Sequence, residues 1–344
     1  MSSGIVQLVS IGAQDEHIIG EPEVSFFSST FKRHSNFSQS VEKQTIQGAV
    51  KSDSMSTIRF ERNGDLLGYS YFTIDDNSRS IDIQDWGRII DKVQLLIGGQ
   101  VIDTQDNDFT EKIAIDTCAP NVSKGSNGTH PGSSARSYFY PLRMFFCEGP
   151  QSAIPLVALQ YHSVELRIDW GPDASDYNIE AYSNYYYLDN EERGIMSSRS
   201  HNILITQVQK SIPSGEFIQD LTFNHPVKYI ACSNTNSESA LTSIDNKIKL
   251  SINGTDICNF KWAKPHFVDI TSYYHTNFVT SPDFFLYCFC LNTNSIQPTG
   301  SLNFSRLESV KIHSQNRRII DPIYCVNYNI LRVNNGMAGL VYAN

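Results

Sequence analysis

The side chains whose types and spacing could support chemistry are mainly acidic residues and one histidine. Asp103, Asp106 and Asp108 supply oxygen ligands at short intervals, as the start of a calcium loop does. Such a loop also needs a central glycine and a distal bidentate glutamate at fixed spacing, which this stretch lacks, so we predict a solvated acidic turn. His162 precedes Glu165 near the start of a predicted strand. No H-x-H pair of the cupin type accompanies it, and we interpret the two residues as an ordinary polar edge.

The signatures of common enzyme classes are absent from the sequence. It contains no G-x-S-x-G, G-x-x-x-x-G-K-S/T, G-x-G-x-x-G or H-E-x-x-H motif. The adjacent carboxylates Asp75-Asp76 and Glu191-Glu192 would point to opposite faces of a strand, whereas glycoside hydrolysis needs two carboxyls across one cleft. The sequence therefore predicts a protein that is not an enzyme, with no catalytic residue, no cofactor-binding residue, no metal ligand and no cofactor.

Cysteines and glycosylation motifs carry little functional signal. The 7 cysteines are scattered through strand-like segments, and we expect buried thiols in a reducing compartment. Asn-x-Ser/Thr motifs begin at Asn36, Asn121, Asn127, Asn253 and Asn303. The chain starts without a basic and then apolar leader, so we expect chance motifs. If any carries sugar, Asn121 and Asn127 are the exposed candidates.

Composition and charge exclude several classes of protein. The 344 residues include 27 Lys plus Arg and 36 Asp plus Glu, a net charge of −9, with 18% charged and 11% aromatic residues. The longest Lys/Arg runs are pairs, so no phosphate-binding track is present and direct contact with nucleic acid is not expected. No apolar run approaches the ~20 residues needed to span a bilayer. A folded chain with low surface charge is expected.

The pattern of short apolar or alternating segments favours an all-β fold. Such segments recur along the chain, and turn pairs such as Asn63-Gly64, Gly98-Gly99 and Asn253-Gly254 separate them. The abundance of aromatic residues fits half-buried pleated sheets. Short helical turns are expected in loops, for example at 152–159, where Pro150 and Pro155 limit their length.

Two collinear matches indicate that the chain is an internal duplication. Residues 93–102 align with 248–257 at an offset of 155, and both read as strand, tight turn, strand. Pro155, Leu159, Tyr161 and Glu165 align with Pro298, Leu302, Phe304 and Glu308 at an offset of 143. A domain of about 150 residues with short strands fits a jelly roll. The sequence therefore predicts two tandem eight-stranded antiparallel jelly rolls.

We place the boundaries of this double jelly roll as follows: an N-terminal arm at 1–21, a first jelly roll at 22–180, a linker at 181–200, and a second jelly roll with a C-terminal strand at 201–344. The loop 120–135 would be the most exposed excursion of the first copy.

With these residues in view, the chain resembles the major capsid proteins of nucleocytoplasmic large DNA viruses over nearly its whole length. The resemblance lies in short motifs that occur in the family's order. They are 8–15, 20–27, 31–37, 62–65, 96–103, 155–162, 187–193, 224–227, 303–306, 327–332 and 336–339.

The resemblance implies a structural role in an icosahedral virion. Three chains of two similar domains would form a pseudo-hexagonal homotrimeric capsomer that tiles the shell, assembled in the host cell cytoplasm. The implied partners are neighbouring capsomers, minor capsid proteins and the inner membrane, toward which the N-terminal arm would point. A disordered terminus is the alternative for that arm.

The resemblance also changes what particular side chains are expected to do. Phe26, Phe27, Phe31 and Phe37 are expected in the core or the trimer interface, and Glu191, Glu192 and Arg193 in local or interdomain ion pairs. The chain is shorter than other members of the family in two loops, 120–135 and 261–282, which form projections on the outer surface of the relatives. The shorter loops imply a low-profile capsomer. Two alternatives stay open: a minor capsid or scaffold paralogue with the same fold, and a sugar-binding or cupin-like β-sandwich.

Overall fold

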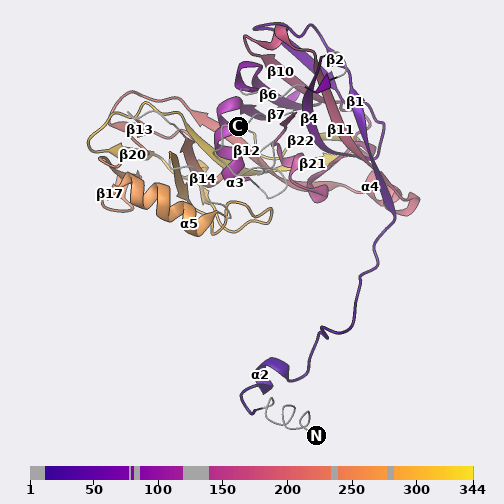
Figure 1. The fold of residues 1–344 in the computed structure, drawn as a ribbon, viewed down its shortest axis with the longest axis horizontal. Helices are drawn as coiled ribbons and strands as arrows, with labels where there is room; N and C mark the ends of the chain where they lie inside the picture. The colour runs from indigo at the N-terminus through magenta and orange to yellow at the C-terminus, as the bar shows by residue number, and fades with distance from the viewer. Residues whose placement is uncertain are drawn as a thin grey trace. The chain divides into compact units, whose positions relative to one another are not determined.

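The computed structural model describes residues 12–76, 79–80, 86–118, 139–233, 239–276 and 283–343. The chain divides into two units, 1–36 and 37–344 (Figure 1). In the described part of the first unit, the helix α2 (Glu16–Ile19) is followed by chain without regular structure. The second unit contains both jelly rolls, so the first jelly roll begins at Phe37 and not at residue 22.

The first jelly roll consists of two antiparallel sheets with short helices in their connections. One sheet has the order β1-β11-β4-β5, with β8 and β9 also on β4, and the other has the order β2-β3-β10-β6-β7. The elements are β1 (Phe37–Gln44), β2 (Ile46–Gln47), β3 (Met55–Arg59), β4 (Leu66–Asp76), β5 (Arg79–Ser80), η1 (Trp86–Arg88), β6 (Ile90–Ile97), β7 (Gln100–Asp106), η2 (Phe109–Ile113), α3 (Ala114–Thr117), β8 (Phe139–Pro141), η3 (Phe145–Cys147), η4 (Pro150–Ser152), β9 (Ile154–Pro155), η5 (Leu156–Ala158), β10 (Val164–Trp170), η6 (Ala174–Asp176) and β11 (Ile179–Leu188).

The second jelly roll follows the helix α4 (Asn190–Ser198) and repeats this arrangement. One sheet has the order β12-β21-β14-β18, with β19 on β14 and β22 on β21, and the other has the order β13-β20-β15-β16, with β17 on β15. The elements are β12 (His201–Ser211), β13 (Ile218–Asp220), β14 (Pro226–Ser233), β15 (Lys247–Ile252), β16 (Thr255–Asp256), β17 (Lys261–Trp262), η7 (Ala263–Ile270), α5 (Thr271–His275), β18 (Phe284–Cys288), β19 (Leu302–Asn303), η8 (Phe304–Arg306), β20 (Val310–Ser314), β21 (Ile323–Asn334) and β22 (Met337–Leu340).

Strand registers test the two sequence matches separately. The offset of 155 is confirmed, because Ile97 pairs with Gln100 in the first hairpin and Ile252 pairs with Thr255 in the second. The offset of 143 is wrong by three residues. Val164 pairs with Ile97, and Val310 pairs with Ile252, so these two valines are equivalent. The misalignment arose because both segments contain proline, leucine and glutamate at similar spacing.

The boundary between the jelly rolls also differs from the predicted linker at 181–200. Residues 181–188 belong to β11, which pairs with β1 and with β4 in the first jelly roll. Its tyrosine-rich sequence alternates between the core and the outer face of a sheet, and is therefore a strand. The first jelly roll thus ends at Leu188, and the connection is α4.

Helices occupy more of the chain than predicted. The turns expected at 152–159 are present as η4 and η5. The helical segments 109–117 and 263–275 were missed, although each has apolar residues at helical spacing. Phe109 and Ile113 are buried in the first segment, and Ala263 and Phe267 in the second. Both segments follow the equivalent hairpin of their jelly roll, and Pro265 is tolerated in the first helical turn.

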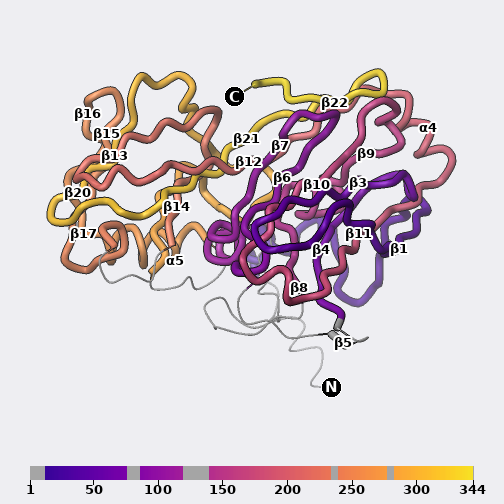
Figure 2. The backbone as a smooth tube through the Cα atoms, turned by 90° about the horizontal axis from the view of Figure 1, so that it is seen from above, coloured from indigo at the N-terminus to yellow at the C-terminus, as the bar shows by residue number. Residues whose placement is uncertain are grey.

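The hydrophobic core does not stop at the domain boundary. One cluster fills the second jelly roll between its sheets. The other fills the first jelly roll and continues onto β14, β18 and β21 of the second. Figure 2 shows β7 beside β12, and β21 with β22 reaching over to the first jelly roll. The two jelly rolls therefore share one buried interface, which we call the seam.

Candidate assembly surfaces

Asp103 and Asp106 form the polar part of the seam. The Asp103 carboxylate accepts hydrogen bonds from the Val208 backbone N–H at 2.9 Å and from Gln105 at 2.9 Å. Asp106 accepts from Lys210 Nζ at 2.6 Å and from the Tyr324 hydroxyl at 2.7 Å. The predicted solvated turn is wrong for Asp103 and Asp106, because strands of the other jelly roll hold both side chains. Asp108 is partly exposed and pairs locally with Lys112 of η2 at 2.6 Å.

Burial gives Asp103 an unusual protonation equilibrium. Its side chain is 3% exposed. Loss of solvation raises its pKa to about 7, although the hydrogen bonds from Val208 and Gln105 act in the opposite direction. The nearby Glu148 carboxylate, which accepts from the Thr206 hydroxyl at 3.1 Å, also has a raised pKa because of burial. The seam therefore contains carboxyl groups whose charge is costly in the folded protein.

The apolar part of the seam is formed by the outer face of the β14-β18-β21 sheet. Tyr229, Phe284 and Tyr324 are at most 3% exposed and belong to the cluster that fills the first jelly roll. The Tyr324 ring lies 5.9 Å from the ring of Phe109 in η2. The Tyr229 hydroxyl hydrogen-bonds with Thr117 of α3. Helix 109–117 is thus packed between its own jelly roll and the sheet of the next one.

The C-terminal hairpin provides a second attachment between the jelly rolls. The Tyr161 backbone N–H donates to the Gly336 carbonyl at 2.9 Å. His162 Nδ1 lies 2.9 Å from the Ala338 carbonyl oxygen and 3.2 Å from the Ala338 nitrogen. Glu165 accepts from Ser163 and does not approach His162 as a second metal ligand. This histidine therefore holds β22 in place.

The charged connection α4 is fixed by one ion pair. Arg193 donates to both carboxylate oxygens of Asp65, at 2.8 Å and 2.9 Å. The local pairing expected of Arg193 is confirmed, while Glu191 and Glu192 lie in the first turn of α4, where their negative charge is favourable. The helix thereby remains attached to the first jelly roll.

The phenylalanines expected in a core or an interface are not in the core of their own chain. Phe26, Phe27 and Phe31 are 96%, 101% and 85% exposed, and Phe37 is 52% exposed. For Phe26, Phe27 and Phe31 the expected place in the core is wrong, because no regular element buries residues 20–36. Phe37 begins β1, where its ring is half-exposed and lies edge-on to Tyr186 at 6.5 Å. The expected place in an interface stays a prediction.

Other predicted sites have simple outcomes. The glycosylation candidates Asn121 and Asn127, and the loop 120–135, lie outside the described residues. Among the residues that the structure describes, His, Cys, Asp and Glu form no group of three that could hold a metal. Within the same ranges, no helix combines the length and apolar character that a membrane crossing requires.

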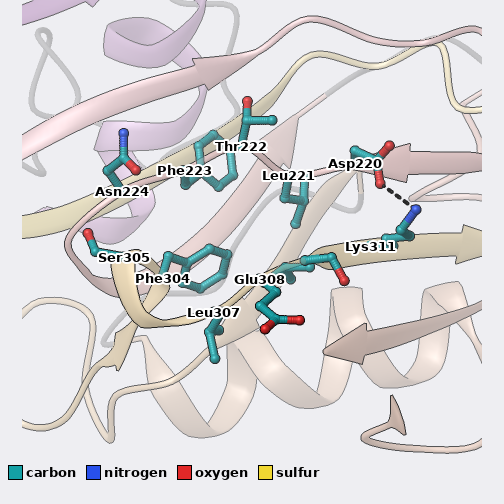
Figure 3. A pocket seen from close by; sticks show the side chains of 12 residues that line it. Asp220, Leu221, Thr222, Phe223, Asn224, Phe304, Ser305, Leu307, Glu308 and Lys311 are labelled. Atoms are coloured by element: carbon teal, nitrogen blue, oxygen red, sulfur yellow. Dashed lines mark ion pairs between the residues drawn. The ribbon is translucent and has the colours of Figure 1, made fainter. Parts of the chain in front are cut away.

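Each jelly roll carries one open groove at an equivalent place. In the second, the groove has a volume of about 490 Å³, and Figure 3 shows Asp220 paired with Lys311 at its rim. In the first, a groove of about 610 Å³ is lined by Arg59, Glu61 and Arg62 among others. The duplicated backbone thus repeats the concavity, while the charges around it have diverged.

Comparison with protein families gives two matches that divide the chain at α4. Residues 25–189 match the model described as the N-terminus of major capsid proteins. Residues 192–339 match the model described as the major capsid protein of large eukaryotic DNA viruses. The division coincides with the end of β11, where the structure ends the first jelly roll.

Full-length relatives and solved structures agree with these matches. The chain is 30% identical to the major capsid protein of Pyramimonas orientalis virus over 403 aligned positions, covering 100% of both chains. It is 27% identical to that of Paramecium bursaria Chlorella virus 1 over 440 positions, again covering 100% of both. The crystal structure of VP54 from the latter virus, PBCV-1, superposes with a TM-score of 0.76 at 24% identity, covering 93% of this chain and 100% of that one. The Faustovirus major capsid protein gives 0.62 at 13% identity, covering 90% and 93%.

Proposed function

The chain belongs to the family of major capsid proteins of large eukaryotic DNA viruses and is a structural subunit of the capsid, and from this premise we propose that three copies form a pseudo-hexagonal capsomer. Two similar jelly rolls per chain give six similar units in a trimer. A closed ring of such units presents nearly the same edge in six directions and can tile a shell hexagonally.

The observation that carries this proposal is the seam. A pseudo-hexagonal ring requires the two jelly rolls of one chain to keep a fixed angle, and a flexible linker would not provide it. Here the Asp106 contacts to Lys210 and Tyr324, the buried Tyr229 and the C-terminal hairpin all join the two domains. A shared core of this kind makes them move as one body.

The finer features of the capsomer follow from the same reading. Alignments of 403 and 440 positions against 344 residues mean that the relatives carry insertions, which supports a low-profile outer surface for this chain. The exposed phenylalanines before β1 support a contact arm, and we propose minor capsid proteins beneath the shell as its partners. Direct contact with nucleic acid is not part of this proposal, since the longest Lys/Arg runs of the sequence are pairs.

Light scattering on the purified chain tests the trimer. The expected mass is roughly three times 38.8 kDa at neutral pH and moderate salt. A monomer at micromolar concentration would contradict the proposal. Electron microscopy of purified particles then separates a major from a minor shell protein. Hexagonal capsomers of this mass, dominating the protein content, are expected for the major one.

A further inference from the structure

The seam inside one chain has an unused counterpart on the outside of each jelly roll. In the second jelly roll, the larger sheet is covered on its outer face by the first jelly roll. In the first jelly roll, no described element of residues 37–344 packs on the equivalent outer face, where Tyr69 and Val41 are exposed. Conversely, helix 109–117 is covered by the neighbouring sheet, whereas the outer side of helix 263–275 is open. Within one chain, the helix of the first jelly roll thus packs on the larger sheet of the second, while the equivalent helix and sheet of the other copy stay exposed.

Strand pairing identifies equivalent residues on the two sheets. Tyr71 pairs with Tyr182, which pairs with Lys43. In the second jelly roll, Ala231 pairs with Tyr324, which pairs with Lys210. The short strands β9 and β19 align the two sheets, because Leu66 pairs with Pro155 directly before η5, and Pro226 pairs with Asn303 directly before η8. Leu66 thus corresponds to Pro226 and, five residues further along, Tyr71 to Ala231. Lys43 therefore corresponds to Lys210 and Tyr182 to Tyr324. Extending the same registers along the strands adds three further equivalences. They match Val41 with Val208, Tyr69 with Tyr229, and Phe139 with Phe284.

These five equivalent pairs are identical in residue type. Their members in the second jelly roll contact the first jelly roll or belong to the seam cluster, and they include Tyr229 and Phe284, which are fully buried. Their counterparts in the first jelly roll lie open or half-buried, with Tyr69 42% and Val41 43% exposed. Stacking organises this face, because the Tyr71 ring lies 5.6 Å from Tyr182 and 6.0 Å from Phe139. We call Val41, Lys43, Tyr69, Tyr71, Phe139 and Tyr182 the sheet face.

The opposing surface is located by the same reasoning. In the seam, Asp106 contacts Lys210 and Tyr324. In the strand register, Asp106 of β7 lies opposite Lys92 of β6. At the offset of 155, Lys92 corresponds to Lys247 of β15, and Lys247 lies opposite Trp262 in the strand register. Trp262 therefore occupies the position that Asp106 has in the first jelly roll. The helix that follows exposes aromatic side chains, with Tyr273 79% and Tyr274 73% exposed. We call Trp262, Ile270, Tyr273 and Tyr274 the helix face.

We infer that the helix face of one chain docks on the sheet face of the next, so that the contact between chains repeats the seam within a chain. This rests on the proposed trimer and names its surfaces. Because the contact is head-to-tail, each chain contributes one face of each kind and three chains close the ring. Within one chain, the Lys247 ammonium already lies 4.6 Å from the centre of the Trp262 ring. At the position of the Asp106 ion pair, Trp262 would also lie near Lys43, where an indole ring attracts an ammonium group.

The test uses two variants of the full chain and a matched control. The helix-face variant carries Tyr273→Glu and Tyr274→Glu, and the sheet-face variant carries Val41→Glu and Tyr69→Glu. The control is Ile212→Glu, at a residue that is also 79% exposed but belongs to neither face. Each face variant should weaken the trimer by ~100-fold or more in dissociation constant, as removal of central aromatic residues does. The control should remain trimeric by light scattering.

Mixing the two variants separates a head-to-tail contact from any other. Each is expected to be monomeric alone, while the mixture should contain a dimer and no trimer, because one intact pair of faces remains. If either face variant stays trimeric, or if Ile212→Glu also dissociates, the inference is overturned. If the unmodified chain is itself monomeric, the proposed trimer is wrong. If the unmodified chain is a trimer and the face variants also stay trimeric, only the assignment of the contact surfaces is wrong.

A cross-link keeps the test valid should the glutamate variants unfold. The double variant Lys43→Cys and Trp262→Cys places one thiol on each face of every chain. Mild oxidation should link it into covalent dimers and trimers on a denaturing gel without reductant. Neither single variant should form this ladder. Absence of the ladder from a folded, trimeric double variant would overturn the assignment of the faces.

Discussion

The two jelly rolls share their sheet order but differ in what covers their larger sheet. In the second, Tyr229 and Phe284 are buried by the first jelly roll. In the first, the equivalent Tyr69 and Phe139 face outward beside Tyr71. The same residue types thus appear in a core-like environment in one copy and at an open surface in the other. Amino-acid type alone therefore does not show whether a side chain is buried within the chain.

The helices that follow the equivalent hairpins show the same difference. Helix 109–117 is packed on both sides, by its own jelly roll and by the neighbouring sheet. Helix 263–275 packs inward through Phe267, whose ring lies 5.6 Å from Phe285, while Tyr273 and Tyr274 point away. Each copy therefore supplies what the other lacks. Substitutions at equivalent positions should consequently act on folding in one copy and on assembly in the other.

The largest difference is expected between Tyr229→Ala and Tyr69→Ala. Truncating the buried Tyr229 should lower the free energy of unfolding by about 3–5 kcal/mol, because it leaves a cavity in the seam. Truncating Tyr69 should cost less than about 1 kcal/mol in a monomer, because its ring is partly exposed. Urea unfolding in the background of the helix-face variant measures both without a contribution from assembly. Equal losses would contradict the proposed division between folding and assembly.

The next largest effect concerns the buried Asp103. Its pKa of about 7 in the folded protein lies above the value of ~3.9 expected for an unfolded aspartate. The folded protein therefore retains a proton that the unfolded chain releases, and this contribution to stability falls as pH rises from about 4 to about 7. Asp103→Asn should remove a slope of about 1 kcal/mol per pH unit over that range.

Urea unfolding at several pH values between 5 and 8 checks this prediction. Gln207→Leu provides the control, because it removes the neighbouring hydrogen bond to the Ile102 carbonyl without removing a titratable group. It should lower stability by a similar amount at every pH. An unchanged slope in Asp103→Asn would show that other groups set the pH dependence of the seam.

A smaller effect distinguishes the equivalent hairpin turns. Gly98 has φ of +58°, and a Cβ there would collide with the His162 ring that holds the C-terminal hairpin. Asn253 occupies the equivalent place with φ of 50°, and its side chain accepts from the Glu308 N–H at 2.9 Å. Gly98→Asn should destabilise by about 1–3 kcal/mol through overpacking and strain. Asn253→Gly should cost about 1 kcal/mol, because it removes the exposed oxygen that accepts from the N–H groups of both Glu308 and Ser309. Thermal unfolding of both variants checks the order.

Much of the fold could be predicted from the sequence because its signals are local. Alternation along 162–170 and the Gly98-Gly99 and Asn253-Gly254 turns produce the strands and hairpins that the structure shows. The tyrosine-rich 181–188 was misassigned to a linker, since its partners β1 and β4 are distant in sequence. The double jelly roll as a whole followed from the internal duplication, in particular from the match of 93–102 with 248–257, and the family resemblance agreed with it.

The assembly surfaces were less predictable because they depend on contacts between domains. The sequence predicted a solvated turn at Asp103 and Asp106. These residues belong to the seam only because β12 and β21 lie beside them in the structure. A signal was nevertheless present in the matching residues Lys43 and Lys210, and Tyr182 and Tyr324. Aligning the copies strand by strand would have found it, but the offset of 143 was wrong by three residues and did not extend to these strands.

The smallest change in stability is expected for the equivalent lysines Lys210 and Lys43. Substituting Lys210 should affect folding, whereas substituting Lys43 should affect assembly. Lys210→Met removes an ion pair to Asp106 inside the seam and should lower the free energy of unfolding by about 0.5–1 kcal/mol. Lys43 pairs with Glu180 on the exposed sheet face, so Lys43→Met should lower the unfolding midpoint of the monomer less than Lys210→Met does. If the sheet face binds the Trp262 ring of a second chain, the same substitution should weaken the trimer severalfold, because a methionine offers no charge to the indole. Lys43→Arg should retain most of the affinity, since a guanidinium also stacks on an indole. Sedimentation across a dilution series measures the dissociation constant of the trimer. Equal constants for the unmodified chain, Lys43→Met and Lys43→Arg would place Lys43 outside the contact.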